Sequence, residues 1–361
     1  MLGLQSRAPW IERGVRWSGR PVMSIQLSHT TPNMPTGEVL VVIVNYNGGS
    51  DLMDCIASVL AQSVPAMIVV VDNGSTDGSD VNVCACFPEV SVRRAPHNLG
   101  FGGAINLAVS ENAGNTIVVL NPDVVLREGC LQALLRALAN RPGVVGPVLH
   151  VSTSGSIEAG WTINHAGMPT VQTPNKAPLY VPGCVLITSR QVFKQVGGFD
   201  DRYFLFVEDV EFCWRALLAG FEVSVASDAE ANHKGGASAA GGYLSPSAPY
   251  RTSDMRVSLR ERNDVALMIA CAPWWWLPVI VPLLLVHCLA VAAGALALRR
   301  PGLAMSLLQG IGWNLRELPT SLRRRRSLKR SPHGCRNPHA RLTSGPLLVR
   351  TIRVHGLPDI R

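Results

Sequence analysis

The chain has 361 residues, of which 47% are hydrophobic and only 16% are charged, enough for one large domain with an appendage. Its net charge of +8 is unevenly placed, because residues 1–250 hold 15 Lys and Arg against 20 Asp and Glu, whereas residues 251–361 hold 18 against 5. The nine cysteines form no C-x-x-C pair, a pattern that excludes a zinc knuckle and favours free thiols.

The N-terminal segment, residues 1–36, carries four arginines but no apolar run. It therefore lacks the pattern of a secretory signal and predicts a disordered leader. A folded domain is expected from 37 to 263. Its first half alternates apolar, β-branched runs with segments of helical spacing: strands at 39–46, 67–71 and 116–120, and helices at 51–62 and within 98–109. This alternation predicts an open α/β sheet.

Polar residues lie at the end of each of these three strands: Asn45-Tyr46-Asn47, Asp72-Asn73-Gly74 and Asn121-Pro122-Asp123. In open α/β sheets, ligands bind beyond the carboxyl ends of the strands. Turn formation alone explains any one of these positions, since Asn-Gly and Asp-Gly pairs favour turns. Three such ends in register predict a ligand site, with Asp123 placed where a metal ligand would be.

Three carboxylates, Glu208, Asp209 and Glu211, lie among the aromatic side chains of the segment 203–214. An apolar setting raises the pKa of a carboxylate and makes it a better base. The alternative is a helix N-terminus, where the helix dipole favours acidic residues.

A single histidine, His233, follows another apolar strand predicted at 221–225. A lone histidine is more often structural than a ligand, and it becomes a candidate ligand only if the fold brings it to Asp123. The segment 151–180 is rich in Pro, Gly and Thr and predicts loops or short strands.

The longest apolar segment, 265–298, runs for 34 positions without a charged side chain, which is long enough to cross a bilayer. Pro273, Pro278 and Pro282 interrupt its first half, so that only 279–298 predicts one uninterrupted helix. A single crossing would place the basic tail outside, against the positive-inside rule.

A second apolar stripe is followed by the basic cluster Arg323–Arg326; its members lie at helical spacing: Leu303, Leu307, Leu308, Ile311, Leu315, Leu318 and Leu322. This pattern is typical of a helix in a membrane interface, and the alternative is a helix packed on the folded domain. We therefore predict membrane-associating helices in 264–330, peripheral or re-entrant, and a basic tail in 331–361. The expected partner of this region is an anionic membrane surface and no nucleic acid, and the sequence indicates no oligomeric state.

Six segments resemble, in order, the family 2 glycosyltransferases of the GT-A fold, especially their rhamnosyltransferase-like branch: VVIVNYNGG (41–49), VVVDNGSTDGS (69–79), HNLGFGGAIN (97–106), VVLNPDVVL (118–126), VGGFDDRYFLFVEDVEFCWRALLAGFEV (196–223) and NHKGGAS (232–238). The resemblance covers roughly residues 39–263. It implies that 37–263 is a GT-A catalytic domain, a mixed sheet flanked by helices, which transfers a sugar from a nucleotide diphosphate with inversion.

The resemblance also implies roles for individual residues. It predicts a pocket for the nucleotide sugar that is lined by Asn45, Tyr46, Asn47, Asp72, Asn98, Gly100, Asn106 and Asn121, with Arg215 on the diphosphate side.

Asp123 matches the last acid of the family's DxD metal motif, whose first acid is Asn121 here. His233 matches a histidine that helps to bind the metal or the diphosphate. The implied cofactor is a divalent cation, Mg²⁺ or Mn²⁺. Asp209 matches the acid of the family's ED motif, which acts as the general base. Glu208 and Glu211 are expected to position the acceptor or to tune that base.

The branch favours dTDP-L-rhamnose as the donor over UDP- or GDP-sugars. The membrane-seeking tail favours a polyprenyl-diphosphate-linked glycan as the acceptor, at the cytoplasmic face of the cell membrane, as in cell-wall or surface-polysaccharide assembly. A non-catalytic module that binds a nucleotide sugar or a lipid is the alternative, and the acids Asp123 and Asp209 argue against it because such a module needs no base.

Two other classes fit less well. A nucleotidyltransferase would carry a basic residue in the glycine-rich segment 47–50, which has none. In a Rossmann dehydrogenase the last glycine of GxGxxG would stand at Ile105.

Overall fold

The computed structural model describes residues 39–164, 169–171, 176–235, 251–327, 341–342 and 359–360. All of them belong to one compact unit, Met34–Arg361. The predicted leader and almost all of the predicted basic tail lie outside the described residues.

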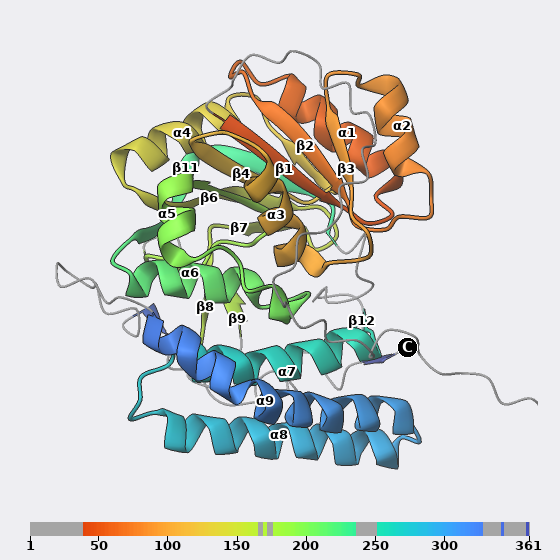
Figure 1. Cartoon of the computed structure of the whole chain (residues 1–361), viewed down its shortest axis with the longest axis vertical. Helices are drawn as coiled ribbons and strands as arrows, with labels where there is room; N and C mark the ends of the chain where they lie inside the picture. The colour runs from red at the N-terminus through yellow and green to blue at the C-terminus, as the bar shows by residue number, and fades with distance from the viewer. Residues whose placement is uncertain are drawn as a thin grey trace, which may run out of the picture. The chain divides into compact units, whose positions relative to one another are not determined.

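A mixed β-sheet forms the centre of the fold (Figure 1). Its strands follow the order β3 (Ser91–Arg94), β2 (Met67–Asp72), β1 (Val39–Asn45), β4 (Thr116–Leu120), β10 (Val185–Ser189), β6 (Gly143–Val151), β11 (Glu222–His233) and β5 (Val124–Leu126), and β7 (Ser156–Glu158) pairs with β6. The first four strands are parallel, whereas β10 runs antiparallel to β4 and β5 runs antiparallel to β11. The α/β sheet predicted from the sequence is confirmed.

Strand β1 shows why these apolar runs become central strands. All seven of its residues are buried, and successive side chains of a strand point to opposite faces of the sheet. Leu40 and Val42 pack in the core on one face, and Val41 and Ile43 pack in the core on the other. Fully burying such a side chain contributes about 1.5–3 kcal/mol, so a strand that is apolar on both sides is stable only between two helical layers.

The two layers use different helices. The first face is covered by α3 (Gly100–Glu111), α5 (Arg190–Val196) and α6 (Glu208–Leu218), and the second by α1 (Gly49–Leu60) and α4 (Cys130–Asn140), with α2 (Ser79–Cys86) next to α1. The helices predicted at 51–62 and within 98–109 correspond to α1 and α3.

Strand β11 is longer than the strand predicted at 221–225. The register of its pairing with β6 shifts between Ala226 and Glu230, as in a β-bulge. After this irregularity the strand continues to His233, which pairs with Val124 of β5. Between β6 and β10 the chain forms only the short strands β7, β8 (Trp161–Ile163) and β9 (Pro169–Val171), as expected for 151–180.

Three long helices follow: α7 (Asp254–Cys271), α8 (Leu277–Ala297) and α9 (Pro301–Ser327). Helix α7 lies beside α6, and α8 is farther from the sheet (Figure 1). The domain boundary predicted at 263/264 falls inside α7, and residues 265–272 pack in the same core as α3 and α6. An apolar run looks the same in a domain core and at a membrane surface, so the sequence pattern did not separate residues 265–272 from the apolar residues that follow them.

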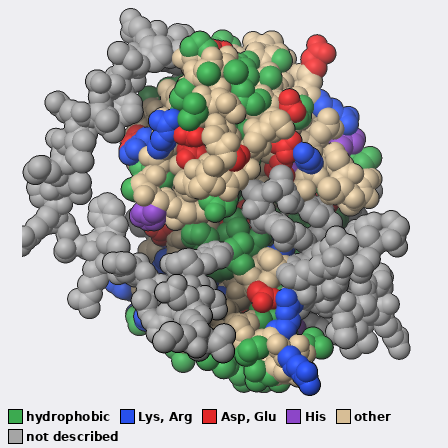
Figure 2. Space-filling model, turned by 90° about the vertical axis from the view of Figure 1, so that its right-hand side faces the viewer, with side chains coloured by type: hydrophobic (Ala, Val, Ile, Leu, Met, Phe, Trp, Pro, Cys, Tyr) green, Lys and Arg blue, Asp and Glu red, His purple; other side chains and the backbone are tan. Residues whose placement is uncertain are grey.

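Helix α8 differs from the end of α7 in its environment. Its exposed side chains include Val279, Leu283, Val286, Leu289 and Leu296. Figure 2 shows hydrophobic side chains along the lower edge of the molecule, where α8 lies. Among the described residues, α8 is the one helix that is long and apolar enough to cross a membrane.

The apolar stripe and basic cluster of α9 are only partly available to a membrane. Leu303 and Leu307 are buried, whereas Leu308 and Leu315 are exposed, so the stripe packs on α7 and α8 at its start.

In the basic cluster, Arg325 donates to the carbonyls of Ile269 and Ala272, and Arg324 contacts Glu211 at 3.3 Å. Only Arg323 and Arg326 of the four are exposed. Two arginines of the basic cluster are thus available to a membrane surface, whereas the other two hold α9 on the folded domain, which agrees with the alternative of a helix packed on that domain.

Candidate active site

The ends of β1 and β2 are joined through their side chains. Asn45 and Asp72 are register partners, and the Asn45 amide donates to Asp72 Oδ1 at 2.9 Å and to Ser79 Oγ at 2.8 Å. Its Oδ1 accepts the Gly48 N–H at 3.1 Å. Asn45 is fully buried, so it fixes the surrounding loops, while Tyr46, 40% exposed, lies beside them at the surface.

The turn after β2 has the hydrogen bonds expected of a turn, and it also lies at the strand edge where a ligand site was predicted. Asp72 Oδ2 accepts the Ser75 N–H at 3.2 Å, which is the expected turn interaction. Asn47 is exposed, has a positive φ of 55°, and accepts the Thr76 N–H at 2.7 Å. These contacts hold the first two loops against each other at the carboxyl edge of the sheet.

The glycine-rich turn is attached to this edge by Asn73, one of the polar residues expected at the end of the second strand. Asn73 donates to Asn98 Oδ1 at 3.0 Å and to the Gly100 carbonyl at 3.1 Å. Gly100 has a φ of +73°, and a Cβ there would lie 2.3 Å from the Phe204 carbonyl oxygen. The glycine is therefore required by this close approach.

Asn106 has a different environment from the one expected. Its amide oxygen accepts the Phe199 N–H at 3.0 Å, and its amide nitrogen donates to the Phe199 carbonyl at 2.9 Å. Because both polar groups of the Asn106 side chain are hydrogen-bonded to the backbone of Phe199, Asn106 holds the loop before α6. Its expected place in the nucleotide-sugar pocket is not supported by these contacts.

Asp123 and His233 meet although 110 positions separate them. His233 Nε2 lies 3.4 Å from Asp123 Oδ1, because β11 pairs with β5 directly after Asp123. The proximity that the sequence left open is confirmed. Burial opposes a charge on His233, but Cys184 and the Asp123 carboxylate raise its pKa overall. A divalent cation at Asp123 would favour the neutral imidazole, since only that form is a ligand.

The donor set fits a weakly held cation. Among the described residues, no group of three or more His, Cys, Asp or Glu side chains could hold a metal. Mg²⁺ is commonly held by one or two carboxylates together with substrate phosphates. Asp123 with His233 therefore suits a cation whose coordination a bound diphosphate completes. Asn121, in the position of the missing acid, is fixed by its backbone N–H, which donates to the Cys184 carbonyl at 2.9 Å.

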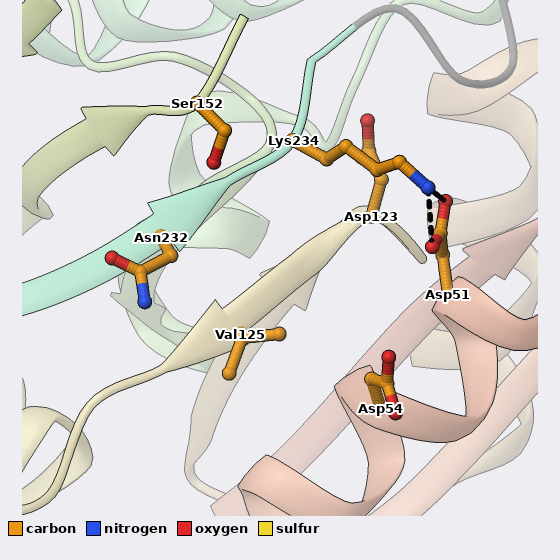
Figure 3. A pocket seen from close by; sticks show the side chains of 7 residues that line it. All are labelled: Asp51, Asp54, Asp123, Val125, Ser152, Asn232 and Lys234. Atoms are coloured by element: carbon orange, nitrogen blue, oxygen red, sulfur yellow. Dashed lines mark hydrogen bonds and ion pairs between the residues drawn. The ribbon is translucent and has the colours of Figure 1, made fainter. Parts of the chain in front are cut away.

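A cavity of about 290 Å³ opens beside Asp123 (Figure 3); its lining consists of Asp51, Asp54, Asp123, Val125, Ser152, Asn232 and Lys234. Lys234 Nζ lies 2.8 Å from Asp51 Oδ1. Exposed ion pairs are worth little, so Lys234 can exchange Asp51 for an anionic ligand. No role was predicted for this lysine, although it directly follows His233 in the sequence.

The three acids of α6 have three environments. The helix begins at Glu208, so the helix N-terminus interpretation is correct for their location. Glu208 and Glu211 are buried, whereas Asp209 is half-buried. Asp209 Oδ2 accepts the Gly183 N–H at 2.9 Å, and Oδ1 accepts the Val210 N–H at 2.8 Å.

The pKa of both neighbouring acids is raised. Burial raises the pKa of Asp209, and the hydrogen bonds from Gly183 and Val210 oppose that rise. Burial and the Asp209 charge raise the pKa of Glu208 well above its usual range. Asp209 is therefore the acid of this helix that combines accessibility with the raised pKa that a base requires.

Glu211 and Arg215 form a buried ion pair, which contradicts the roles expected for both. Arg215 Nε lies 2.5 Å from Glu211 Oε1, and neither side chain is exposed. The guanidinium also donates to the carbonyls of Val196 and Gly198. The guanidinium N–H groups of Arg215 donate to partners inside the protein, so this side chain is not placed to bind a diphosphate. Glu211 is buried in the same pair and is not placed to contact an acceptor.

Comparisons with known proteins agree with this arrangement. Residues 40–197 match the family model described as glycosyl transferase family 2, and residues 163–234 match one described as the N-terminal domain of galactosyltransferase. The chain is 31% identical over 230 residues to an N-acetylglucosaminyl-diphospho-decaprenol L-rhamnosyltransferase of Mycobacterium tuberculosis, which covers 54% of this chain and 75% of the relative.

A more distant relative is the low-salt glycan biosynthesis hexosyltransferase Agl10 of Haloferax volcanii, 23% identical over 222 residues, which cover 54% of this chain and 67% of the relative. Among solved structures, the chain is similar to the crystal structure of GalNAc-T7 with UDP, GalNAc and Mn²⁺, with a TM-score of 0.52 and 16% identity. The match covers 65% of this chain and 48% of that one, and it supports the fold.

Proposed function

The chain belongs to family 2 of the glycosyltransferases, in its rhamnosyltransferase-like branch, and we propose that it transfers L-rhamnose from dTDP-rhamnose, with inversion, to a polyprenyl-diphosphate-linked glycan. The observation that carries the proposal is the half-buried Asp209, held by two backbone N–H groups at the start of α6. The similarity to a decaprenol-linked rhamnosyltransferase supports the donor and the acceptor.

In the proposed reaction, Asp209 removes the proton from an acceptor hydroxyl, and the oxygen attacks the anomeric carbon from the side opposite the diphosphate. The Gly183 and Val210 N–H groups hold the carboxylate in place. A divalent cation held by Asp123 and neutral His233 would stabilise the charge of the departing nucleoside diphosphate. Lys234 directly follows His233 and forms an exposed ion pair with Asp51. When this ion pair opens, the Lys234 ammonium would attract the negative charge of the nucleoside diphosphate.

A panel of donors tests this function. The full chain is mixed with Mg²⁺ or Mn²⁺ and with dTDP-, UDP- or GDP-sugars, and both the released nucleoside diphosphate and the melting temperature are measured. We expect a selective response to dTDP-rhamnose. A response to a UDP-sugar alone would keep the enzyme class and refute the donor. Silence across the panel would favour the non-catalytic binding module.

We also propose that α8 docks the enzyme on an anionic membrane at the cytoplasmic face, in a peripheral or re-entrant manner. Its exposed apolar side chains continue into Trp274 and Trp275, which are 52% and 78% exposed, and tryptophan favours membrane interfaces. The exposed Arg323 and Arg326 supply positive charge on the neighbouring helix. This docking would bring a lipid-linked acceptor to the catalytic domain.

Substitutions on α8 test the docking better than truncation, because removing residues from 264 onward would cut α7 and the core. The triple variant Leu283→Asp, Val286→Asp and Leu289→Asp should lower binding to phosphatidylglycerol-containing vesicles at least about tenfold, since each side chain loses apolar burial. Flotation measures it. The matched controls are Val81→Asp and Ile157→Asp, which change exposed apolar residues elsewhere. Equal binding by all variants would refute the docking surface.

A further inference from the structure

The segment that leads into α6 has a strained backbone. Phe204, Phe206 and Val207 have φ values of 63°, 67° and 71°, and they are three of the five non-glycine residues with positive φ in the described part of the chain. Each such residue costs on the order of 1–3 kcal/mol and persists only where its surroundings fix it. We call this segment, residues 203–207, the catalytic-loop turn.

One side chain of α7 holds the catalytic-loop turn. Asn263 is fully buried, and its amide nitrogen donates to three carbonyls, those of Tyr203 at 2.9 Å, Leu205 at 2.9 Å and Phe206 at 2.8 Å. A side-chain amide has only two N–H bonds, so these three acceptors share them. The N–H groups of Asn263 are thus directed to this one segment of backbone, while its Oδ1 accepts the Arg262 Nε–H at 2.9 Å.

Two further hydrogen bonds hold the catalytic-loop turn. The neighbouring Arg262 donates to the Tyr203 carbonyl at 2.8 Å, and the Phe101 N–H donates to the Phe204 carbonyl at 2.7 Å. Four successive carbonyls of the turn are therefore bonded from outside it. The conformation is imposed by α7 and α3, because the local sequence, without glycine, does not favour it.

The catalytic-loop turn determines where Asp209 lies. Its last residue, Val207, is the N-cap of α6, and Asp209 follows two residues later. The Asp209 carboxylate must meet the Gly183 N–H, on a different element, at 2.9 Å. A shift of the turn would move the start of α6 and with it this carboxylate, and a displacement of about 1 Å can cost about 10²-fold in rate.

We propose that Asn263 is a positioning residue for proton transfer: it holds the strained catalytic-loop turn so that Asp209 meets Gly183 and the acceptor hydroxyl. The proposal rests on the proposed role of Asp209 as the base. It extends the catalytic machinery to α7, a helix that also packs on α8 and α9.

A buried asparagine on α9 provides a matched control. Asn314 is 7% exposed, and its amide donates to the Arg262 and Gly310 carbonyls at 2.9 and 3.1 Å, without a contact to the catalytic-loop turn among the bonds of the described residues. Removing either amide should lower stability, because buried carbonyls lose a partner. Only the loss of Asn263 should change the chemistry.

The experiment compares full-length Asn263→Ala, Asn263→Asp and Asn314→Ala with the unmodified chain. Asn263→Asp keeps the shape and the acceptor for the Arg262 Nε–H but loses the N–H donors, so comparison with the alanine variant separates loss of the donors from loss of side-chain volume; the melting temperature of each variant establishes that it folds. We expect kcat to fall about 10²-fold in both Asn263 variants, with the donor KM within about twofold. Loss of the Gly183 hydrogen bond would also move the acid limb of the pH–kcat profile to higher pH. Asn314→Ala should lower the melting temperature alone.

Amide hydrogen exchange at Gly183 gives a second readout that needs no activity. Its exchange should be faster in the Asn263 variants than in Asn314→Ala, while the amides of the following strand β10 are unchanged. Equal kcat and equal exchange in all variants would overturn the positioning role. If Asp209→Asn also stayed active, the base assignment itself would fail, and the two failures are thereby distinguished.

Discussion

Replacing Asp209 by asparagine should lower the rate of sugar transfer by about 10²- to 10⁴-fold, the usual contribution of a general base, while the donor still binds. The substitution keeps the size of the side chain and one acceptor for the Gly183 or Val210 N–H. It removes the carboxylate that would take the proton. Single-turnover rates, together with donor-dependent thermal shifts, measure the two effects separately.

Glu208→Gln is the matched control for this substitution. Glu208 is buried, and burial together with the Asp209 charge raises its pKa well above the usual range, which favours its neutral form. Glutamine copies the neutral acid, and we expect a far smaller loss of turnover than in Asp209→Asn. Comparable losses in both variants would mean that the base assignment to Asp209 is wrong.

The pH dependence of the reaction follows from the same carboxylate. Burial raises the pKa of Asp209 above the ordinary aspartate value of 3.8, and only the ionised form accepts a proton. Activity should therefore fall as the pH drops through this raised pKa, at a higher pH than an exposed aspartate would give. The pH–kcat profile of the unmodified chain measures this limb, and a flat profile down to the ordinary aspartate value would contradict it.

The sequence was most informative where local pattern determines structure. β1, β2 and β4 were predictable because burial on both faces leaves a continuous apolar run. The carboxyl ends of these strands share one edge of the sheet, so the meeting of Asn45 with Asp72 could be expected from their positions at the ends of β1 and β2.

Long-range contacts were the part that pattern could not supply. Asn73 was expected at the end of a strand, but its bond to the Gly100 carbonyl was not predictable from local pattern. Asn263 looked like an ordinary polar residue, and its importance comes from carbonyls in a distant part of the sequence. The hydrophobicity of 265–298 was recognised, but composition does not distinguish core from surface. Residues 265–272 pack in the domain core, whereas Val286 is 64% exposed.

The acidic residues of α6 show that helical spacing alone does not distinguish a structural ion pair from a ligand contact. The spacing of Glu211 and Arg215, one turn apart on a helix, fits an ion pair inside the protein as well as a ligand contact. The structure assigns the pair to the interior, with Arg324 of α9 3.3 Å from the same carboxylate. Glu211 therefore contributes to the contact between α6 and α9.

Breaking this pair should have the largest effect on stability. Glu211→Gln leaves Arg215 charged and buried without its carboxylate, and removing one partner of a buried pair costs about 3–5 kcal/mol. Denaturant unfolding measures the loss. Asp228→Asn, which breaks an exposed pair with Arg136, should change the unfolding midpoint very little.

A double-mutant cycle separates the ion pair from a role in donor binding. Glu211→Leu with Arg215→Met removes both charges, so it should be less destabilised than the sum of the single variants, with a coupling energy of about 0.5–3 kcal/mol. Part of the cost should remain, because the Val196 and Gly198 carbonyls lose their donor. The donor KM should stay unchanged in the folded Arg215→Met variant. A large rise in that KM without loss of stability would show that Arg215 binds the diphosphate of the donor. Strong coupling with an unchanged KM would show that the ion pair helps to hold α6, and therefore Asp209, in position.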